Sequence, residues 1–133
     1  MPKVVNSFVK EHDYDRVRAL QESIIEKIKA DFKQYFHGNT LFKLNLVFDF
    51  IALQLSKENK KFVYGVLKKG GRAKEFELEI QWLMDAGLVY KTTRVTKPEL
   101  PLKFYEDLSA FKLFLCDCGL MGAMADISRC SIR

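Results

Sequence analysis

The fold is indicated most strongly by KKFVYGVLKKGGRAKEFELEIQWLMDAGLVYKTTRV (residues 60–95) and, after a proline-containing loop, by LSAFKLFLCDCGLMGAM (residues 108–124). Apolar residues recur every three to four positions where a helix is expected, and β-branched and aromatic residues gather where strands are expected. The pattern predicts a strand over 61–66, a basic glycine turn over 68–71, a helix over 72–86, a strand over 88–95, a wing over 96–108, a returning strand over 110–116 and a helix from 119. This order is the layout of a winged helix.

Two further helices are predicted upstream. Asp13 is a suitable cap for a helix of about 22 residues that ends near His37 and Gly38. A second helix is expected from Asn39 or Thr40 to residues 56–59. This second helix has two apolar stripes, one formed by Leu41, Leu44, Phe48, Ile51 and Leu55 and the other by Phe42, Leu46, Phe50 and Leu53. A helix that is apolar on two sides is either central in its fold or in contact with a partner.

These elements predict an α+β chain, mainly α, in which two N-terminal helices pack on a winged-helix domain with a small antiparallel β-hairpin. Residues 1–59 are expected to form the helical segment, residues 60–127 the winged helix, and residues 128–133 a tail without regular structure. The core of the winged helix is assigned to Phe76, Ile80, Trp82 and Leu83.

Composition places bounds on location and partners. The net charge of +5 permits an anionic partner without requiring one. No run approaches the ~20 apolar residues of a membrane span, and the N-terminus lacks the apolar core of a signal peptide. A cytoplasmic location and no membrane partner are therefore expected. Cys116, Cys118 and Cys130 lack the spacing of a zinc site, so they are predicted to be reduced and mostly buried, with Cys130 as an exposed exception.

No catalytic constellation is visible in the sequence. Residues 65–72 superficially echo a phosphate-binding loop, but Gly71 stands where the lysine should be and Arg72 where the hydroxyl should be. The two histidines lack neighbours that would form a proton relay. The chain is therefore expected not to be an enzyme, with no cofactor, no metal and no small-molecule substrate.

Basic residues support a nucleic-acid hypothesis. Candidate phosphate contacts lie on the turn, the hairpin and the wing, at Lys68, Lys69, Arg72, Lys91, Arg94 and Lys97. The presumed recognition helix, however, is expected to expose four acids, Glu75, Glu77, Glu79 and Asp85, which phosphates would repel. Weak, non-specific DNA binding is compatible with this pattern, whereas reading of base sequence is not expected.

Residues 57–124 closely resemble the middle of a large bacterial and archaeal group of AAA-type ATPases, most specifically at 57–65, 81–90 and 101–115. The opening residues 1–36 are similar to the stretch that follows the ATPase core in that group. The resemblance implies a helical and winged-helix segment placed between a P-loop ATPase core and a C-terminal nuclease-like domain of unknown function. No position here matches the Walker motifs or the nuclease residues, and Cys116 and Cys118 stand where the group has aliphatic residues. The chain is therefore expected to be a fragment of such an ATP-binding protein.

Two functions remain open from the sequence. The first is a non-catalytic connector and interaction module that uses Phe42, Leu46, Phe50 and Leu53 for a protein partner or for self-association. The second is a stand-alone winged-helix DNA-binding protein that contacts phosphates through the basic turn and the wing. A nucleotide hydrolase is excluded by the missing motif residues.

Overall fold

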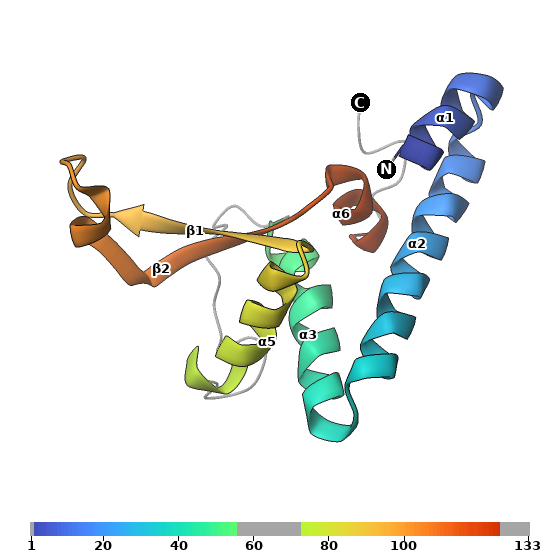
Figure 1. The fold of residues 1–133 in the computed structure, drawn as a ribbon. Coiled ribbons are helices and arrows are strands. Elements are labelled where there is room, and N and C mark those ends of the chain that lie inside the picture. Colours follow the sequence, from blue (N-terminus) through green and yellow to red (C-terminus); the bar gives the residue numbers. More distant parts are fainter. Residues whose placement is uncertain (1, 56–72, 126–133) are drawn as a thin grey trace. The chain divides into compact units, whose positions relative to one another are not determined.

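The described part of the chain is mainly helical and contains a two-stranded antiparallel sheet (Figure 1). The computed structural model describes residues 2–55 and 73–125. The predicted α+β, mainly α class is confirmed. In chain order the elements are α1 (Pro2–Glu11), α2 (Tyr14–Tyr35), α3 (Gly38–Leu55), α5 (Ala73–Asp85), β1 (Val89–Val95), the 3-10 helix η1 (Leu102–Tyr105), β2 (Glu106–Leu115) and α6 (Cys118–Met124).

The chain divides into two compact units. Unit 1 comprises residues 1–45 and 117–133, and unit 2 comprises residues 46–116. Helix α3 continues from the first unit into the second, and α6 returns to the first unit. The expected strand over 61–66, the basic turn over 68–71, the tail over 128–133 and Cys130 lie outside the described residues. The winged-helix assignment therefore stays a prediction.

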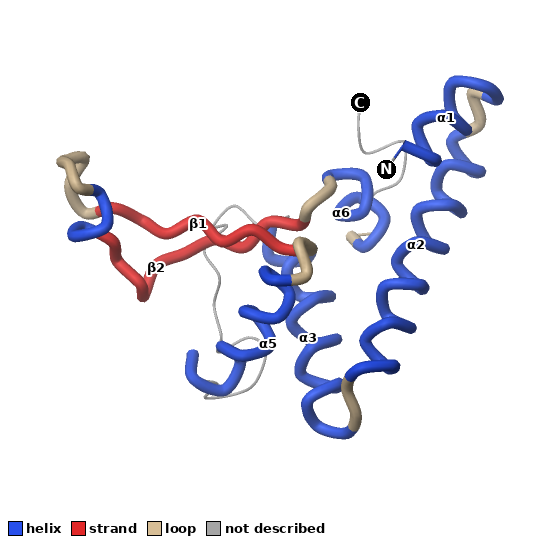
Figure 2. The backbone as a smooth tube through the Cα atoms, in the orientation of Figure 1, coloured by secondary structure: helices blue, strands red, loops and turns tan. Residues whose placement is uncertain are grey.

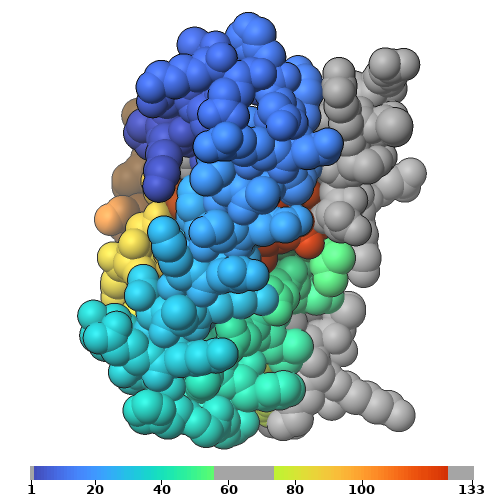
Figure 3. Space-filling model, turned by 90° about the vertical axis from the view of Figure 1, so that its right-hand side faces the viewer, coloured from blue at the N-terminus to red at the C-terminus, as the bar shows by residue number. Residues whose placement is uncertain are grey.

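Unit 1 is built around α2. The Asp13 side chain accepts hydrogen bonds from the backbone N–H groups of Asp15 and Arg16, so the predicted cap and the helix that it starts are confirmed. Both α1 and α6 lie against α2. The side chains of α2 run along the face turned to the viewer in Figure 3. On the interior, Phe32 and Leu120 are buried.

The turn between α1 and α2 was not expected from the sequence. His12 has a positive φ of 53°, which reverses the chain between the two helices. Its backbone N–H donates to the Phe8 carbonyl at 2.8 Å, and its ring Nδ1 lies 2.8 Å from the same oxygen. The Phe8 ring also contacts the Tyr14 ring, with centroids 4.8 Å apart. These contacts fasten α1 to the start of α2.

Unit 2 contains the C-terminal part of α3, helix α5 and the hairpin, and each of them contributes buried apolar side chains. Phe48, Ile51, Phe76 and Leu83 are almost fully buried. Val89, the first residue of β1, is buried as well. The predicted core positions Phe76, Ile80 and Leu83 are confirmed, whereas Trp82 is only half-buried. Strands β1 and β2 lie side by side, and their connecting loop is at the end of the hairpin farthest from α5 (Figures 1 and 2).

Helix α5 ends in a glycine-dependent cap. Gly87 has a φ of 75°, its N–H donates to the Met84 carbonyl, and the Leu88 N–H donates to the Leu83 carbonyl. This pair of bonds is a Schellman motif, which satisfies two carbonyls that the helix would otherwise leave exposed. The helix predicted over 72–86 therefore ends within one residue of its predicted end.

Gly87→Ala is expected to lower the free energy of unfolding by about 1–2 kcal/mol. No atom lies within 4 Å of the position that the added Cβ would occupy, so the penalty comes from the positive φ and not from a clash. Urea unfolding followed by circular dichroism would measure it. Ala86→Gly is the matched control at a neighbouring position. An equally large loss of unfolding free energy in this control would contradict the conclusion that the positive φ of Gly87 causes the penalty.

Three details of the sequence-based interpretation are wrong. Cys116 and Cys118 are exposed rather than buried, because they flank the turn at Asp117 that leads from β2 into α6. The segment predicted as the wing ends before residue 108, because β2 already begins at Glu106. Helix α3 begins at Gly38, ahead of both residues expected to cap it.

Candidate functional site

The hairpin contains a sharp bend in β2. Thr93 pairs with Phe111, but its neighbour Arg94 pairs with Asp107, so residues 108–110 stand opposite no residue of β1. Extra residues on one strand bend that strand and interrupt its ladder. The change of direction in β2 is visible in Figure 2. The bend divides the hairpin into two parts. The base comprises residues 89–93 and 111–115 and contributes buried side chains to the core, and the outer part comprises residues 94–107 and carries the loop.

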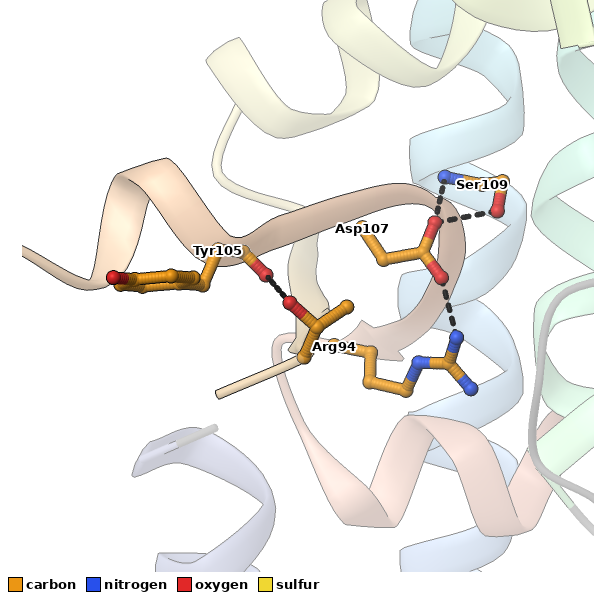
Figure 4. Close-up of polar contacts among 5 residues, drawn as sticks. Arg94, Tyr105, Asp107 and Ser109 are labelled. Carbon is orange, nitrogen blue, oxygen red and sulfur yellow. Dashed lines mark hydrogen bonds and ion pairs between the residues drawn. The ribbon is translucent and has the colours of Figure 1, made fainter. Parts of the chain in front are cut away.

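Polar contacts around Asp107 hold the bend (Figure 4). One carboxylate oxygen accepts hydrogen bonds from the backbone N–H and the hydroxyl of Ser109. The other oxygen accepts from the guanidinium of Arg94 on the opposite strand. The Ser109 hydroxyl, the Ser109 N–H and the Arg94 charge together lower the pKa of Asp107 below its ordinary value.

Ser109→Ala is expected to raise the pKa of Asp107, because it removes the hydroxyl that lowers this pKa most. Since the folded-state pKa lies below the unfolded one, Asp107 stabilises the fold at pH values above about 4, and this contribution is lost as pH falls through the lowered pKa. Carbon NMR titration of the carboxyl group would measure the midpoint. Arg94→Gln should raise it less, and an unchanged midpoint in Ser109→Ala would contradict the role of the hydroxyl.

The loop beyond the bend exposes apolar side chains. Thr96 closes it, since its N–H and its hydroxyl both donate to the Tyr105 carbonyl, at 2.8 Å and 3.1 Å. The Tyr105 hydroxyl donates to Glu99 at 3.1 Å. The large apolar side chains that this ordered outer part of the hairpin exposes are Leu100 (87%), Leu102 (47%), Phe104 (83%) and Leu108 (69%). We call these four residues the loop cluster.

The hairpin cations among the predicted phosphate contacts have partners within the hairpin. The Lys91 ammonium lies over the Phe111 ring, 4.6 Å from its centroid. Arg94 is ion-paired with Asp107, although its side chain remains 66% exposed. Lys97 is exposed at the start of the loop. Lys68, Lys69 and Arg72 lie outside the described residues, so the predicted set of phosphate contacts stays a prediction.

The acids of α5 are less exposed than expected. Glu77 and Asp85 are exposed, Glu75 is half-buried, and Glu79 is buried with 7% of its surface accessible. Gln81 donates to Asp85 at 2.8 Å, so the one amide on this helix that could read a base is engaged within the helix. The prediction that Glu79 is exposed is wrong, because Glu79 lies on the buried side of α5 together with Phe76 and Ile80.

Comparison with known proteins identifies the family. Residues 1–131 match the family model described as "Domain of unknown function (DUF8612)". The chain belongs to the DUF8612 family. No curated protein and no solved structure matches it significantly.

In this DUF8612 chain, α3 presents its predicted partner face only in part. Phe42 is 65% exposed and Leu53 is 50% exposed, whereas Leu46 and Phe50 are half-buried. The other stripe is the buried one: Leu44, Phe48, Ile51 and Leu55 are all in the core. The two stripes of α3 therefore have different roles: the stripe that contains Phe48 forms part of the core, and the stripe that contains Phe42 and Leu53 is partly exposed to solvent.

Within residues 2–55 and 73–125, His, Cys, Asp and Glu side chains nowhere form a group of three that could hold a metal ion. In the same ranges, no helix combines the length and the apolar character that crossing a bilayer requires. The residues that sequence reasoning missed are those of the loop cluster. The sequence signal for these residues was that Leu100 and Leu102 flank Pro101. Proline fixes its own φ, which limits how the loop can turn such leucines towards the core.

Proposed function

We propose that this chain is a non-catalytic interaction module that docks on a protein partner, or on a second copy, through exposed apolar side chains. The observation that carries this proposal is the loop cluster, in which Leu100, Leu102 and Phe104 are exposed in the loop and Leu108 is exposed at the bend of the same hairpin. Exposed apolar groups that are gathered together mark interaction surfaces more often than scattered ones do. The exposed Phe42 and Leu53 of α3 support the same function.

The resemblance of residues 1–125 to the segment after the core of AAA-type ATPases gives this module a context. In that context the chain would be a winged-helix connector of an ATP-binding protein, and its partner surfaces would meet the ATPase or effector domains. The basis for this context is the sequence resemblance alone.

Light scattering and a hydrophobic dye would test the docking proposal. We expect self-association or dye fluorescence in the unchanged chain, and a clear reduction of the signal in a Leu100→Ser, Phe104→Ser double variant, because the two most exposed side chains of the loop cluster become polar. Lys103→Ser is the matched control within η1 and should leave the signal unchanged. A monomer that binds no dye would contradict the proposal.

The second candidate is a DNA-binding protein that contacts phosphates through the hairpin. Exposed Lys97 and Lys112 favour it, whereas the intramolecular partners of Lys91 and Arg94 reduce the charge available to phosphates. Anisotropy of a labelled duplex at about 50 mM and about 200 mM salt would test it. Binding that is lost at the higher salt and weakened by Lys97→Glu would support phosphate contacts. No binding at either salt would contradict this candidate.

A further inference from the structure

The base of the hairpin has two faces of different character. The register places Tyr90 opposite Phe114 and Thr92 opposite Lys112, so these four side chains lie on one face of the two strands. All four are exposed to solvent, Tyr90 at 60% and Phe114 at 36%. We call this face, formed by Tyr90, Thr92, Lys112 and Phe114, the outer face. The side chains that are buried on the opposite face are those of Val89, Phe111 and Leu113.

The two aromatic rings of the outer face are not used by the fold. Tyr90 and Phe114 are directly opposite each other, which places their Cβ atoms about 5 Å apart. Among the described residues, however, neither ring is in contact with another aromatic ring or lies beneath a cation. Aromatic rings are stabilised when a second planar ring covers them in an offset stack. The outer face therefore presents two rings to a ligand that has planar rings of its own.

The charge of the outer face is positive. Lys112 is exposed and lies two residues from Phe114, about 7 Å along β2. Arg94 follows Thr92 by two residues on β1, and its side chain is 66% exposed although it is ion-paired with Asp107. Two copies that met through their outer faces would bring two positively charged faces together, which disfavours self-association at this place. An anionic ligand is favoured instead, in a chain whose net charge is +5.

We propose that the outer face binds a single strand of nucleic acid, with unpaired bases stacked on Tyr90 and Phe114 and a phosphate next to Lys112. This inference goes beyond the docking function proposed above and does not depend on it. Stacking on an aromatic side chain accepts any base, because every base has a π face. The hydroxyl of Thr92 adds a donor for a phosphate or for the edge of a base. The site therefore binds single strands without reading their sequence.

A single strand fits the outer face better than a duplex or a protein does. In a duplex the bases are stacked on one another, so the two rings would find no base face to cover, whereas unpaired bases can be splayed onto aromatic side chains. A protein partner is held by a larger area, in which anchoring side chains are buried in pockets. Two exposed rings with a neighbouring cation match the composition of a nucleotide, which joins a planar base to a phosphate.

The test is an NMR titration of the full-length, nitrogen-15-labelled chain with a single-stranded deoxythymidine oligomer of about eight nucleotides, at about 50 mM salt. We expect shift changes at the amides of residues 90–92 and 112–114. Tyr90→Leu should raise the Kd about fivefold or more, because it removes a stacking ring and keeps an apolar side chain at an exposed position. Tyr35→Leu is the matched control on α2, where the tyrosine is 67% exposed, and should alter the Kd less than about twofold.

Two further pairs of variants separate the outer face from the loop cluster and the stacking from the charge. Phe114→Leu should raise the Kd about fivefold or more, whereas Phe104→Leu, in the loop beyond the bend, should change it less than about twofold. Lys112→Gln should weaken binding and reduce its dependence on salt, because one phosphate contact is lost. Lys103→Gln removes the same charge on η1 and should have a smaller effect on both.

Four outcomes would overturn the inference. The first is equal binding of an oligomer of the same length that lacks its bases, or of a duplex, since either would show attraction to phosphates without stacking. The second is a set of shift changes confined to residues outside the outer face. The third is an equal Kd for free thymidine monophosphate, which would make the ligand a nucleotide and not a strand. The fourth is tighter binding of the peptide acetyl-Glu-Phe-Glu-amide at the same amides, which would assign the outer face to a protein partner.

Discussion

Phe48→Ala is expected to lower the free energy of unfolding by about 3–5 kcal/mol. Phe48 lies in the middle of α3 with only 1% of its surface exposed, among the fully buried side chains of unit 2. Truncation removes most of a ring that is in van der Waals contact on all sides and leaves a cavity that a close-packed core fills only partly. Urea unfolding monitored by circular dichroism would measure the change. Because a loss of this size is a large fraction of the stability of a small domain, partial unfolding at 37 °C is also expected.

Phe42→Ala is the matched control, with the same substitution in the same helix. Phe42 is 65% exposed, so its truncation should change the free energy of unfolding by about 0.5 kcal/mol or less. It should, however, reduce dye binding or self-association if this face contacts a partner. Equal destabilisation by the two variants would contradict the assignment of Phe48 to the core and Phe42 to the surface.

Leu83→Asp is expected to have a still larger effect, of about 4–5 kcal/mol or more at pH 7, because it places a carboxyl group at a fully buried position. Burial raises the pKa of such a carboxyl above its unfolded value. The destabilisation should therefore be full above the raised pKa and should shrink as pH falls towards about 4, where the introduced group is neutral in both states. Unfolding of the variant and of the unchanged chain, compared at each pH, would give this difference.

Leu78→Asp provides the comparison within the same helix. Leu78 is 81% exposed on α5, so the same substitution should cost about 0.5 kcal/mol or less and should show little dependence on pH. A variant at Leu83 that is as stable as the variant at Leu78 would exclude the described orientation of α5.

The regular elements were predictable where one physical signal was dominant. Helix α2 follows from the Asp13 cap and from a long apolar periodicity, and α5 follows from a similar stripe and from the glycine at its end. The strands were recognisable by their β-branched and aromatic residues. Helix α1 was not predicted, because the first expected helix begins at the Asp13 cap and nothing in the residue type of His12 indicates the positive φ that joins α1 to α2. That conformation is stabilised by contacts with Phe8, which local propensity does not describe.

The candidate site was less predictable than the fold. The sequence correctly indicated two different stripes on α3, but the degree of exposure of each depends on tertiary packing. The basic residues of the hairpin were visible, yet the ion pair of Arg94 with Asp107 depends on a register shift that no alternation pattern shows, and the contact of Lys91 with Phe111 depends on which residues the two strands pair. Glu79 was misassigned for a similar reason, since a polar residue type does not show which side of α5 faces the core.

The bend in β2 has a further consequence for how this chain can vary. In a regular hairpin, a change of one residue in the loop would shift the pairing along the strands and turn every side chain to the opposite face. Here the unpaired residues 108–110 interrupt the ladder before the base is reached, so the pairing of Val89 with Leu115 is set independently of the loop. The segment from residue 94 to residue 107 can therefore change in length while the pairs from Val89–Leu115 to Thr93–Phe111 keep their register.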